Sequence, residues 1–562
     1  MAYFQMEELR MRFNFDQTID VEKTNAYMVG AGLASLSAAI FLIRDGHVPG
    51  KNIHIFEELN VTGGSMDGSG DADHGYVLRG GRMFDEEAYA CTFDAMRDIP
   101  SLTDPKVTIL DEFNAFNKKI YISGKARLID NDGNIIDTSS LGFNLADRLA
   151  LMDIMVKPED SFGTKTIEDC FPESFFQTNF WFMWTTTFAF EPWHSAIEFK
   201  RYLHRFIHEL PRLNDLSGVR RTPYNQYDSM LLPMTKWLES QGVSFEMNCR
   251  VTDLEFKPSE TETTVTGIKC VKDGKEKKIE LDQGDLVFAT IGSLTAGASV
   301  GSMTTAPEIN DKHVGGDWAL WETIAKGRPE FGKPQVFNER VNESLWQSFT
   351  VTLKDPTMVN RIVEFTGNKP GTGTLMTFKE SGWFMSMVLV NQPHFINQPD
   401  NVQVLWGYCL FPFNEGDFVK KRMVDCTGEE VLTELLHHLK FDSDIDKILK
   451  TSICKPCILP FTTAQFLTRA KGDRPATIPE GSTNLALLGQ FCEIPDDVVF
   501  TMDYSVRGAQ TAVYKFLNLN KKVTPIYKGQ YDARVLINSA VSMLKDDNLR
   551  EEIGALKAML LK

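Results

Sequence analysis

The first sixty residues combine two hydrophobic patterns. Residues 25–29 and 52–56 are short apolar runs, whereas residues 33–44 form a longer apolar segment with small residues among the aliphatic ones. Short runs bounded by turn residues are typical of buried strands, and the longer segment is typical of a helix. Residues 26–43 are also about long enough to span a bilayer, but their glycines and serines stand where a strand–turn–helix needs them. The pattern therefore predicts a βαβ unit with a parallel sheet.

Strand patterns return later, after an aromatic stretch at about 150–240 whose aromatic residues are concentrated between positions 171 and 206. Within that stretch, Phe199, Tyr202, Leu203, Phe206 and Ile207 form an apolar stripe at helical spacing. Further strands are predicted at 243–251, 263–271, 277–281, 285–290 and 484–488, the last followed by a helix at about 505–517. Because strand signals occur at the start, middle and end of the chain, we expect one domain assembled from discontinuous segments.

Length and charge restrict the class of protein. The chain has 562 residues, 43% hydrophobic and 24% charged, which is typical of a folded globular protein. At about 100–200 residues per domain, this length implies several cooperating domains. The net charge of −17 argues against a nucleic-acid partner, because binding to a phosphate backbone requires clustered Lys and Arg.

The cysteines indicate a reduced, cytoplasmic protein. They are odd in number and sparse, at positions 91, 170, 249, 270, 409, 426, 454, 457 and 492. Cys454 and Cys457 form a CxxC pair, but neither a second pair nor a nearby His completes a tetrahedral zinc set. We therefore expect no metal site. The first residues also lack the apolar core of a secretory signal.

The turn after the first predicted strand has the pattern of a dinucleotide-binding loop. Gly30 and Gly32 begin a GxGxx motif in which Ser35 replaces the third glycine. Such glycines permit a tight turn and a close approach to a pyrophosphate at the helix N-terminus, and Ser35 is a small substitute at the helix–strand contact. Glu57, 27 residues after Gly30, stands where a carboxylate accepts hydrogen bonds from ribose hydroxyls, and Glu58 competes for that role. Ordinary tight-turn glycines are the alternative.

Further glycine pairs favour FAD as the dinucleotide. They lie in residues 61–66 and 79–82, and with ATIGS at 289–293 and the later GQF element they resemble flavoproteins of the glutathione-reductase and amine-oxidase type. Residues 371–373 are an incomplete motif without a preceding strand, so no NAD(P)H site is expected. The expected contacts to FAD are Gly30, Gly32, Ser35, Glu57, Glu58, Gly64, Ser65, Arg82, Val251, Ser293 and Gly489.

These signals predict an α/β fold with a Rossmann-like FAD-binding domain of the glutathione-reductase/amine-oxidase type, an α+β substrate domain and a helical C-terminal region. The expected division is an arm at 1–24, the FAD-binding domain at 25–150, 241–300 and 481–520, the substrate-binding domain at 151–240 and 301–480, and the C-terminal region at 521–562.

Several stretches together resemble the oleate hydratase family, also called myosin-cross-reactive antigens. They are NAYMVGAGLASLSAAIFLIRDG, NIHIFEELNVTGGSMDGSG, VLRGGRMFDEEAY, TTFAFEPWHSAIEFKRYLHRF, TPYNQYDS and FTMDYSVRGAQTAVY, and they cover most of residues 25–520. The resemblance implies a hydro-lyase that binds FAD and adds water across the cis-9 double bond of oleate-like unsaturated fatty acids. The products are 10-hydroxy fatty acids, with no net redox change. It further implies that reduced FAD supports activity, either through its negative charge near a cationic centre or as a structural group.

Hydration of an isolated alkene needs a proton on one carbon and a water molecule held and deprotonated at the other. The resemblance places the family's tyrosine acid at Tyr202. A phenol keeps its proton at neutral pH because its ordinary pKa is about 10. The alternative is that Tyr202 simply packs within the apolar stripe described above.

One departure from the family concerns the water side of the reaction. The glutamate that usually ends an RGGRE motif is Met83 here, and a thioether cannot take a proton from water at neutral pH. We expect Asp85 or Glu86, which follow closely, to orient the water instead. A solvated acidic turn is the alternative, as is a variant or much less active hydratase.

The fatty acid itself needs an apolar tunnel and a partner for its carboxylate. The aromatic stretch supplies tunnel material, and the resemblance assigns Gln226 and His394 to the carboxylate. Val388 and Val390 stand where the family usually has hydroxyl and amide side chains, so the head-group site is expected to be altered.

Two other classes stay open on the sequence alone. One is a flavin oxidoreductase related to amine oxidases or polyene desaturases, and the other is a non-catalytic flavoprotein of lipid or membrane surfaces. Leu549, Ile553, Leu556 and Leu560 stand at helical spacing, a pattern that suits either a membrane surface or docking on the protein. We expect a cytoplasmic homodimer or monomer whose membrane contact, if any, is peripheral and transient.

Overall fold

A five-stranded parallel sheet lies at the centre of the computed structural model, which describes residues 19–81, 83–259, 261–310, 315–372 and 375–543. Its order is β19-β12-β1-β2-β8, and every neighbouring pair is parallel. The strands are β1 (Ala26–Val29), β2 (Ile53–Phe56), β8 (Ser244–Glu246), β12 (Leu286–Thr290) and β19 (Leu485–Leu488). The sheet therefore confirms the parallel α/β core, drawn from the start, middle and end of the chain.

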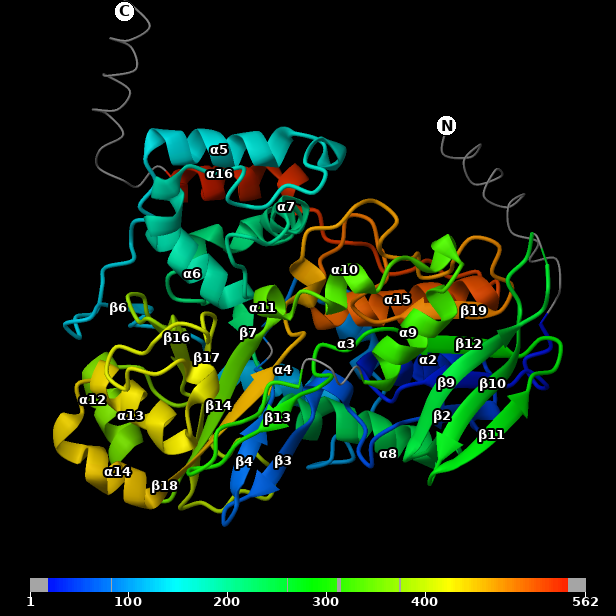
Figure 1. Cartoon of the computed structure of the whole chain (residues 1–562), viewed down its shortest axis with the longest axis horizontal. Coiled ribbons are helices and arrows are strands. Elements are labelled where there is room, and N and C mark those ends of the chain that lie inside the picture. Colours follow the sequence, from blue (N-terminus) through cyan, green and yellow to red (C-terminus); the bar gives the residue numbers. More distant parts are fainter. Residues whose placement is uncertain (1–18, 82, 260, 311–314, 373–374, 544–562) are drawn as a thin grey trace, which may run out of the picture.

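Both faces of this sheet are covered (Figure 1). In β1, Ala26 and Met28 pack into the core shared with α2 (Leu33–Arg44) and α15 (Met502–Phe516), whereas Tyr27 and Val29 pack toward Trp318 of α9 (Gly316–Ala325). Successive side chains of a strand point to opposite faces, so an apolar run is what a doubly covered sheet requires. An antiparallel sheet of β9 (Cys249–Phe256), β10 (Val265–Lys272) and β11 (Lys275–Glu280) adjoins α9.

A second, seven-stranded sheet has the order β13-β18-β14-β17-β16-β15-β6. Its strands are β13 (Ser299–Val300), β18 (Ser452–Leu459), β14 (Trp346–Leu353), β17 (Gln403–Cys409), β16 (Met385–Val388), β15 (Leu375–Phe378) and β6 (Leu128–Ile129). The helices α12 (Thr357–Thr366), α13 (Gly428–His438) and α14 (Ile445–Thr451) share an apolar core with one face of it.

The edges of this sheet differ from the expected domain division. Strands β6 and β13 come from segments 25–150 and 241–300, which we expected in the FAD-binding domain. Both are two-residue strands, and a run that short carries no periodic signal in the sequence. An edge strand offers unpaired N–H and C=O groups to whichever backbone lies alongside it, so the sheet recruits these segments through tertiary contacts.

Strand β18 also explains the CxxC pair. Cys454 packs with the helices on one face of the sheet, whereas Cys457 belongs to the core on the other face. Positions three apart on a strand point in opposite directions. The two thiols therefore cannot bind one metal ion together.

The aromatic stretch lies in a helical region at the top of Figure 1. It contains α5 (Leu145–Val156), α6 (Asn179–Phe188), α7 (Ala196–Arg205), the 3₁₀ segment η5 (Ile207–Arg212) and α16 (Ala533–Met543). The expected stripe begins on α7, which ends at Arg205, and Phe206 and Ile207 stay buried beyond its end.

Shorter elements complete the fold: β3 (Gly68–Asp71), β4 (Gly75–Leu78), β5 (Phe84–Asp85), α3 (Ala90–Met96), α4 (Ile109–Lys119), β7 (Val219–Arg220), α8 (Leu232–Ser240), α10 (Gln335–Asn338) and α11 (Val341–Ser344). The apolar positions at 549–560 lie outside the described residues. Within the described part of the chain, no helix has both the length and the apolar character needed to cross a bilayer.

A buried ion network fixes α7 in place. Glu198 Oε1 accepts hydrogen bonds from Arg469 Nη2 at 3.0 Å and Arg474 Nη1 at 2.9 Å. Burial acts to raise the pKa of Glu198, but the charges of Arg474, Arg469 and Arg201 lower it to about 2. Tyr202 lies one helical turn after Glu198, so the network also fixes the position of that tyrosine.

We expect Glu198→Ala to lower the free energy of unfolding by about 3–5 kcal/mol, because Arg469 and Arg474 lose a fully buried carboxylate and are left with the partly exposed Glu493. Urea denaturation measures the loss, with Glu280→Ala as the control. Glu280 forms an ion pair with Lys278 and is 72% exposed, so its loss should cost about 0–1 kcal/mol.

The pH dependence has a defined sign. A carboxyl whose pKa is lowered by folding stabilises the protein fully above its ordinary pKa, and this stabilisation is lost as the pH falls through the folded pKa. The difference between wild type and Glu198→Ala should therefore shrink as the pH falls from about 5 towards 2. A difference below about 1 kcal/mol at neutral pH would contradict the anchoring role.

Candidate functional site

A groove of about 1640 Å³ opens at the carboxyl ends of β1, β2, β12 and β19. This is the edge at which open parallel sheets bind ligands. Nine of the eleven residues expected to contact a dinucleotide line it: Gly30, Gly32, Glu57, Glu58, Gly64, Ser65, Val251, Ser293 and Gly489. The βαβ pattern and the glycine pairs thus converge on one groove.

Two glycine loops approach each other closely at the N-terminus of α2. A Cβ atom added to Gly64 would lie 3.2 Å from the Cα atom of Gly32. Gly64 also has a φ of +57°, and Gly30 has a φ of +88°, which favour glycine. The result is a cradle of backbone atoms at a helix N-terminus, the arrangement that suits a pyrophosphate.

Two acidic residues of the groove, Glu57 and Glu58, are bonded to backbone N–H groups. Glu57 accepts from the N–H of Ala31 at 2.7 Å and from that of Leu59 at 2.9 Å. Burial raises the pKa of Glu57, although these two N–H groups act in the opposite direction. Glu58 accepts from the N–H of Gly316 at 2.9 Å. Glu57 therefore ties the glycine turn to the end of β2 while lining the groove.

The two remaining expected contacts are Ser35 and Arg82. Ser35 is fully buried, and its hydroxyl lies 3.3 Å from that of Thr290, so it packs the helix against the sheet instead of lining the groove. Ser35 is the third residue of α2 and faces β12, which explains the difference. Arg82 lies outside the described residues. Arg79, from the same RGGR segment, does line the groove and donates to the carbonyl oxygen of Gly64 at 2.9 Å.

A second cavity, of about 950 Å³, lies between α6, α7 and the seven-stranded sheet. Most of its wall is apolar, with Phe188, Phe206, Leu213, Leu216, Trp346, Leu375, Val388 and Trp406 among the lining residues. Phe500 and Thr501 line both this cavity and the groove. The two spaces are therefore neighbours that share part of a wall.

Tyr202 lies on the wall of the apolar cavity. Its side chain is 1% exposed, and its hydroxyl donates to the carbonyl oxygen of Val499 at 2.6 Å. The ring also packs edge-on against Phe188 and Phe190, with centroids 5.1 and 4.9 Å away. Tyr202 therefore packs among aromatic rings and also lines the cavity.

The acidic turn after Met83 divides between the cavity and solvent. Met83 and Asp85 both line the cavity, and Asp85 accepts from the N–H of Ala88 at 2.7 Å. Glu86 instead has a side chain that is 66% exposed and pairs with Arg220. Asp85 is the last residue of β5, and Glu86 begins the turn that follows the strand. Of the two residues expected to orient water, Asp85 lines the cavity and Glu86 does not.

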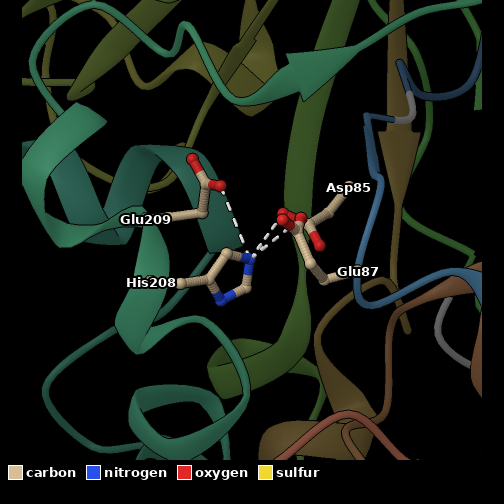
Figure 2. Close-up of side chains that lie close together, drawn as sticks. All are labelled: Asp85, Glu87, His208 and Glu209. Carbon is tan, nitrogen blue, oxygen red and sulfur yellow. Dashed lines mark hydrogen bonds and ion pairs between the residues drawn. The ribbon is translucent and has the colours of Figure 1, made fainter. Parts of the chain in front are cut away.

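Three charged residues that the sequence analysis missed lie at or beside the cavity. Glu209 and Arg221 line it, and His208 Nε2 lies 2.8 Å from Asp85 Oδ2 (Figure 2). Burial raises the pKa of Glu209 to about 8, with a further contribution from the charge of Asp85. Burial lowers the pKa of Arg221 to about 10. The available signal for His208 and Glu209 was their position directly after the apolar stripe that ends at Ile207.

Gln226 and His394 are not among the residues that line the cavity. They belong to adjacent backbone segments, since the N–H of Asn225 donates to the carbonyl oxygen of His394 at 2.8 Å. Burial, with the charge of Arg221, lowers the pKa of His394 to about 3, so the imidazole is neutral at physiological pH. Arg221 is the cationic side chain that the cavity wall itself presents.

Comparison with known proteins gives concordant matches. Residues 23–514 match the model of the MCRA family. An oleate hydratase of Streptococcus pyogenes serotype M49 (strain NZ131) is 40% identical over 529 residues, which are 92% of this chain and 89% of that protein. A linoleate hydratase of Lactiplantibacillus plantarum is 37% identical over 570 residues, which are 93% of this chain and 98% of that protein.

Among solved structures, cyclohexylamine oxidase from Brevibacterium oxydans IH-35A aligns with a TM-score of 0.50. The alignment covers 88% of this chain and 99% of the oxidase, at 12% identity. Identity this low shows a shared fold alone, and that fold is the amine-oxidase type expected from the sequence.

Proposed function

The chain belongs to the MCRA family, and we propose on this premise that it is an FAD-dependent hydratase of unsaturated fatty acids. The relatives are named for oleate and linoleate, so the proposed substrates are oleate-like acids, hydrated at the cis-9 double bond to 10-hydroxy acids. The observation that carries the proposal is the meeting of Tyr202 and Asp85 on one apolar cavity beside the dinucleotide groove.

The cavity contains the two groups that hydration needs. We propose that the Tyr202 hydroxyl gives its proton to one alkene carbon, while positive charge develops on the other. Asp85 orients a water molecule towards that second carbon and takes a proton from it as the C–O bond forms. One proton leaves Tyr202 and one arrives at Asp85, so release of the proton from Asp85 and return of a proton to the phenolate restore the enzyme without any redox change.

The groove fits FAD through its backbone cradle. Gly30, Gly32 and Gly64 would face the pyrophosphate, and Glu57 or Glu58 would face the ribose. When bound in its reduced, anionic form, the flavin supplies negative charge that stabilises a cationic centre in a low-dielectric site.

The fatty acid carboxylate needs a partner on the cavity wall. We propose Arg221 for this role, because a buried guanidinium is a strong partner for a carboxylate. Val388 also lines the cavity, in agreement with an altered head-group site. The roles inferred for Gln226 and His394 stay predictions.

The activity is tested by incubating the enzyme with oleate and reduced FAD in ¹⁸O-labelled water. We expect a hydroxy acid carrying one labelled oxygen, with no electron acceptor consumed. Tyr202→Phe should lower turnover by about 10²-fold or more, since it removes the general acid, and leave FAD affinity unchanged. Tyr408→Phe is the matched control, because Tyr408 lines the same cavity and donates to the carbonyl oxygen of Thr186.

Substrate-dependent flavin reduction without labelled product would instead indicate an oxidoreductase. Absence of both reactions would indicate a non-catalytic lipid-binding protein. Equal turnover in Tyr202→Phe and wild type would reject Tyr202 as the acid.

The cofactor assignment is tested by Gly64→Ala, which we expect to weaken FAD binding about tenfold or more. The added methyl group would press on Gly32 and strain a positive φ, at a cost of about 1–3 kcal/mol. Gly163→Ala is the control, since Gly163 has a similar φ of +53° but open space around it. Flavin fluorescence titration measures the affinity, and equal affinities of the two variants would contradict the cradle.

The head-group assignment is tested by Arg221→Met with oleate and with its methyl ester. We expect KM for oleate to rise about ten- to hundredfold, as for loss of a hydrogen bond to a charged group worth about 1.5–3 kcal/mol. The methyl ester should be insensitive to the substitution. Arg220→Met is the control, because the neighbouring guanidinium pairs with the exposed Glu86. Equal losses for both substrates would contradict the role.

A further inference from the structure

A cluster of three carboxylates surrounds one imidazole nitrogen beside the apolar cavity. His208 Nε2 lies 2.8 Å from Asp85 Oδ2, 3.5 Å from Glu209 Oε1 and 3.7 Å from Glu87 Oε2. Figure 2 shows the three carboxylates converging on this nitrogen from β5, the segment after it and η5. Asp85 and Glu209 line the cavity, whereas Glu87 is 44% exposed. The cluster therefore leads from the cavity wall to solvent.

The side chain of Glu209 is buried and packs directly against Gly218. Its side chain is 8% exposed, and its Oε2 atom is buried without a hydrogen-bond partner among the described residues. A side chain at Gly218 would collide with this carboxyl group. An ionised oxygen left buried and unpaired is costly, so the second oxygen of Glu209 points to a bound proton or to a ligand in the cavity.

The charges around the cluster favour holding a proton there. Arg212 pairs with Glu209, and the ring of Tyr527 packs edge-on against His208 with centroids 4.9 Å apart. Arg205 donates to the carbonyl oxygen of Tyr527 and pairs with Asp497 and Asp503, which lie outside the cluster. Arg212 and a protonated His208 can thus balance two of the three carboxylates. Two neighbouring carboxyl groups do not ionise together without cost.

We propose that His208 and Glu209 are positioning residues for hydration, which act by keeping Asp85 ionised and aimed at the water molecule. The inference rests on the proposed function. His208 donates its Nε2 proton to Asp85, which fixes the direction of that carboxylate. Glu209 holds a proton beside it. The proton that Asp85 takes from water is shared with the cluster and leaves through Glu87 to solvent. Tyr202 regains from solvent the proton that it gave to the alkene, so the protons balance over one turnover.

The electrostatics agree with this geometry. Burial acts to raise the pKa of Asp85, but the hydrogen bond and the charge of His208 lower it. Burial also acts to lower the pKa of His208, yet the three carboxylates raise it. Each partner therefore favours the charged form of the other. This pair gives the chain a carboxylate base near Met83, where the thioether itself cannot accept a proton.

The test is the pH profile of kcat/KM for oleate hydration in His208→Gln. Asp85 must be ionised to accept a proton, so activity falls as the pH drops below its pKa. Removing the neighbouring cation raises that pKa, and we expect the acidic limb to move up by about 1–3 pH units. Activity at high pH should recover to within a few fold of wild type. His204→Gln is the control, since His204 lies on the same helical region and contacts the carbonyl oxygen of Met155 instead.

Glu209→Gln tests the proton that Glu209 holds. The amide resembles the protonated acid, so we expect near-wild-type turnover at neutral pH, whereas Glu209→Ala should lose turnover. A uniform loss at every pH in His208→Gln would show a merely structural role and overturn the inference.

A second measurement needs no activity. NMR titration of the His208 imidazole in the full chain should give a pKa above the ordinary value of about 6.5, and Asp85→Asn should lower it. If wild type forms no hydroxy acid, the proposed function fails. The His208 pKa in wild type and in Asp85→Asn then still shows whether the two side chains interact. An unshifted His208 pKa, or a stoichiometric metal ion in the purified enzyme by elemental analysis, would overturn the inference.

Discussion

A carboxylate on the wall of an apolar cavity stays ionised only when a cation or several hydrogen-bond donors accompany it. The contact of 2.8 Å between Asp85 and His208 meets this requirement, and neighbouring features follow from it. The two-residue strand β5 turns Asp85 inward, the segment η5 brings His208 and Glu209 to it, and Gly218 leaves room for Glu209. Without the imidazole, burial would favour the neutral acid, which is a poor acceptor for a proton from water.

Burial and hydrogen-bond partners also differ among the acidic residues 85–87. Asp85 is buried and bonded, Glu86 is exposed and paired with Arg220, and Glu87 lies between these extremes. Three similar side chains thus acquire three environments within a single turn. The environments, rather than the residue types, decide which carboxyl can act in the cavity.

The position of Tyr202 depends on contacts that are far apart in the chain. Glu198, one turn earlier on α7, is held by Arg469 and Arg474, and the Tyr202 hydroxyl bonds to Val499. Residues 500 and 501 then form the shared wall of the cavity and the groove. The shared wall brings a dinucleotide groove, assembled from discontinuous segments, next to an apolar cavity built largely from residues of segments 151–240 and 301–480.

Local rules were sufficient for the sequence to determine the βαβ unit, the glycine cradle and the parallel sheet. Short apolar runs, positive-φ glycines and helical spacing depend on neighbours within a few residues. The choice of Asp85 over Glu86 and the placing of His208, Glu209 and Arg221 depended on burial and on partners more than a hundred positions away. Asp85 and His208, for example, are separated by 123 positions. Only the tertiary structure decides which polar side chains lose water together, and therefore which of them share a proton.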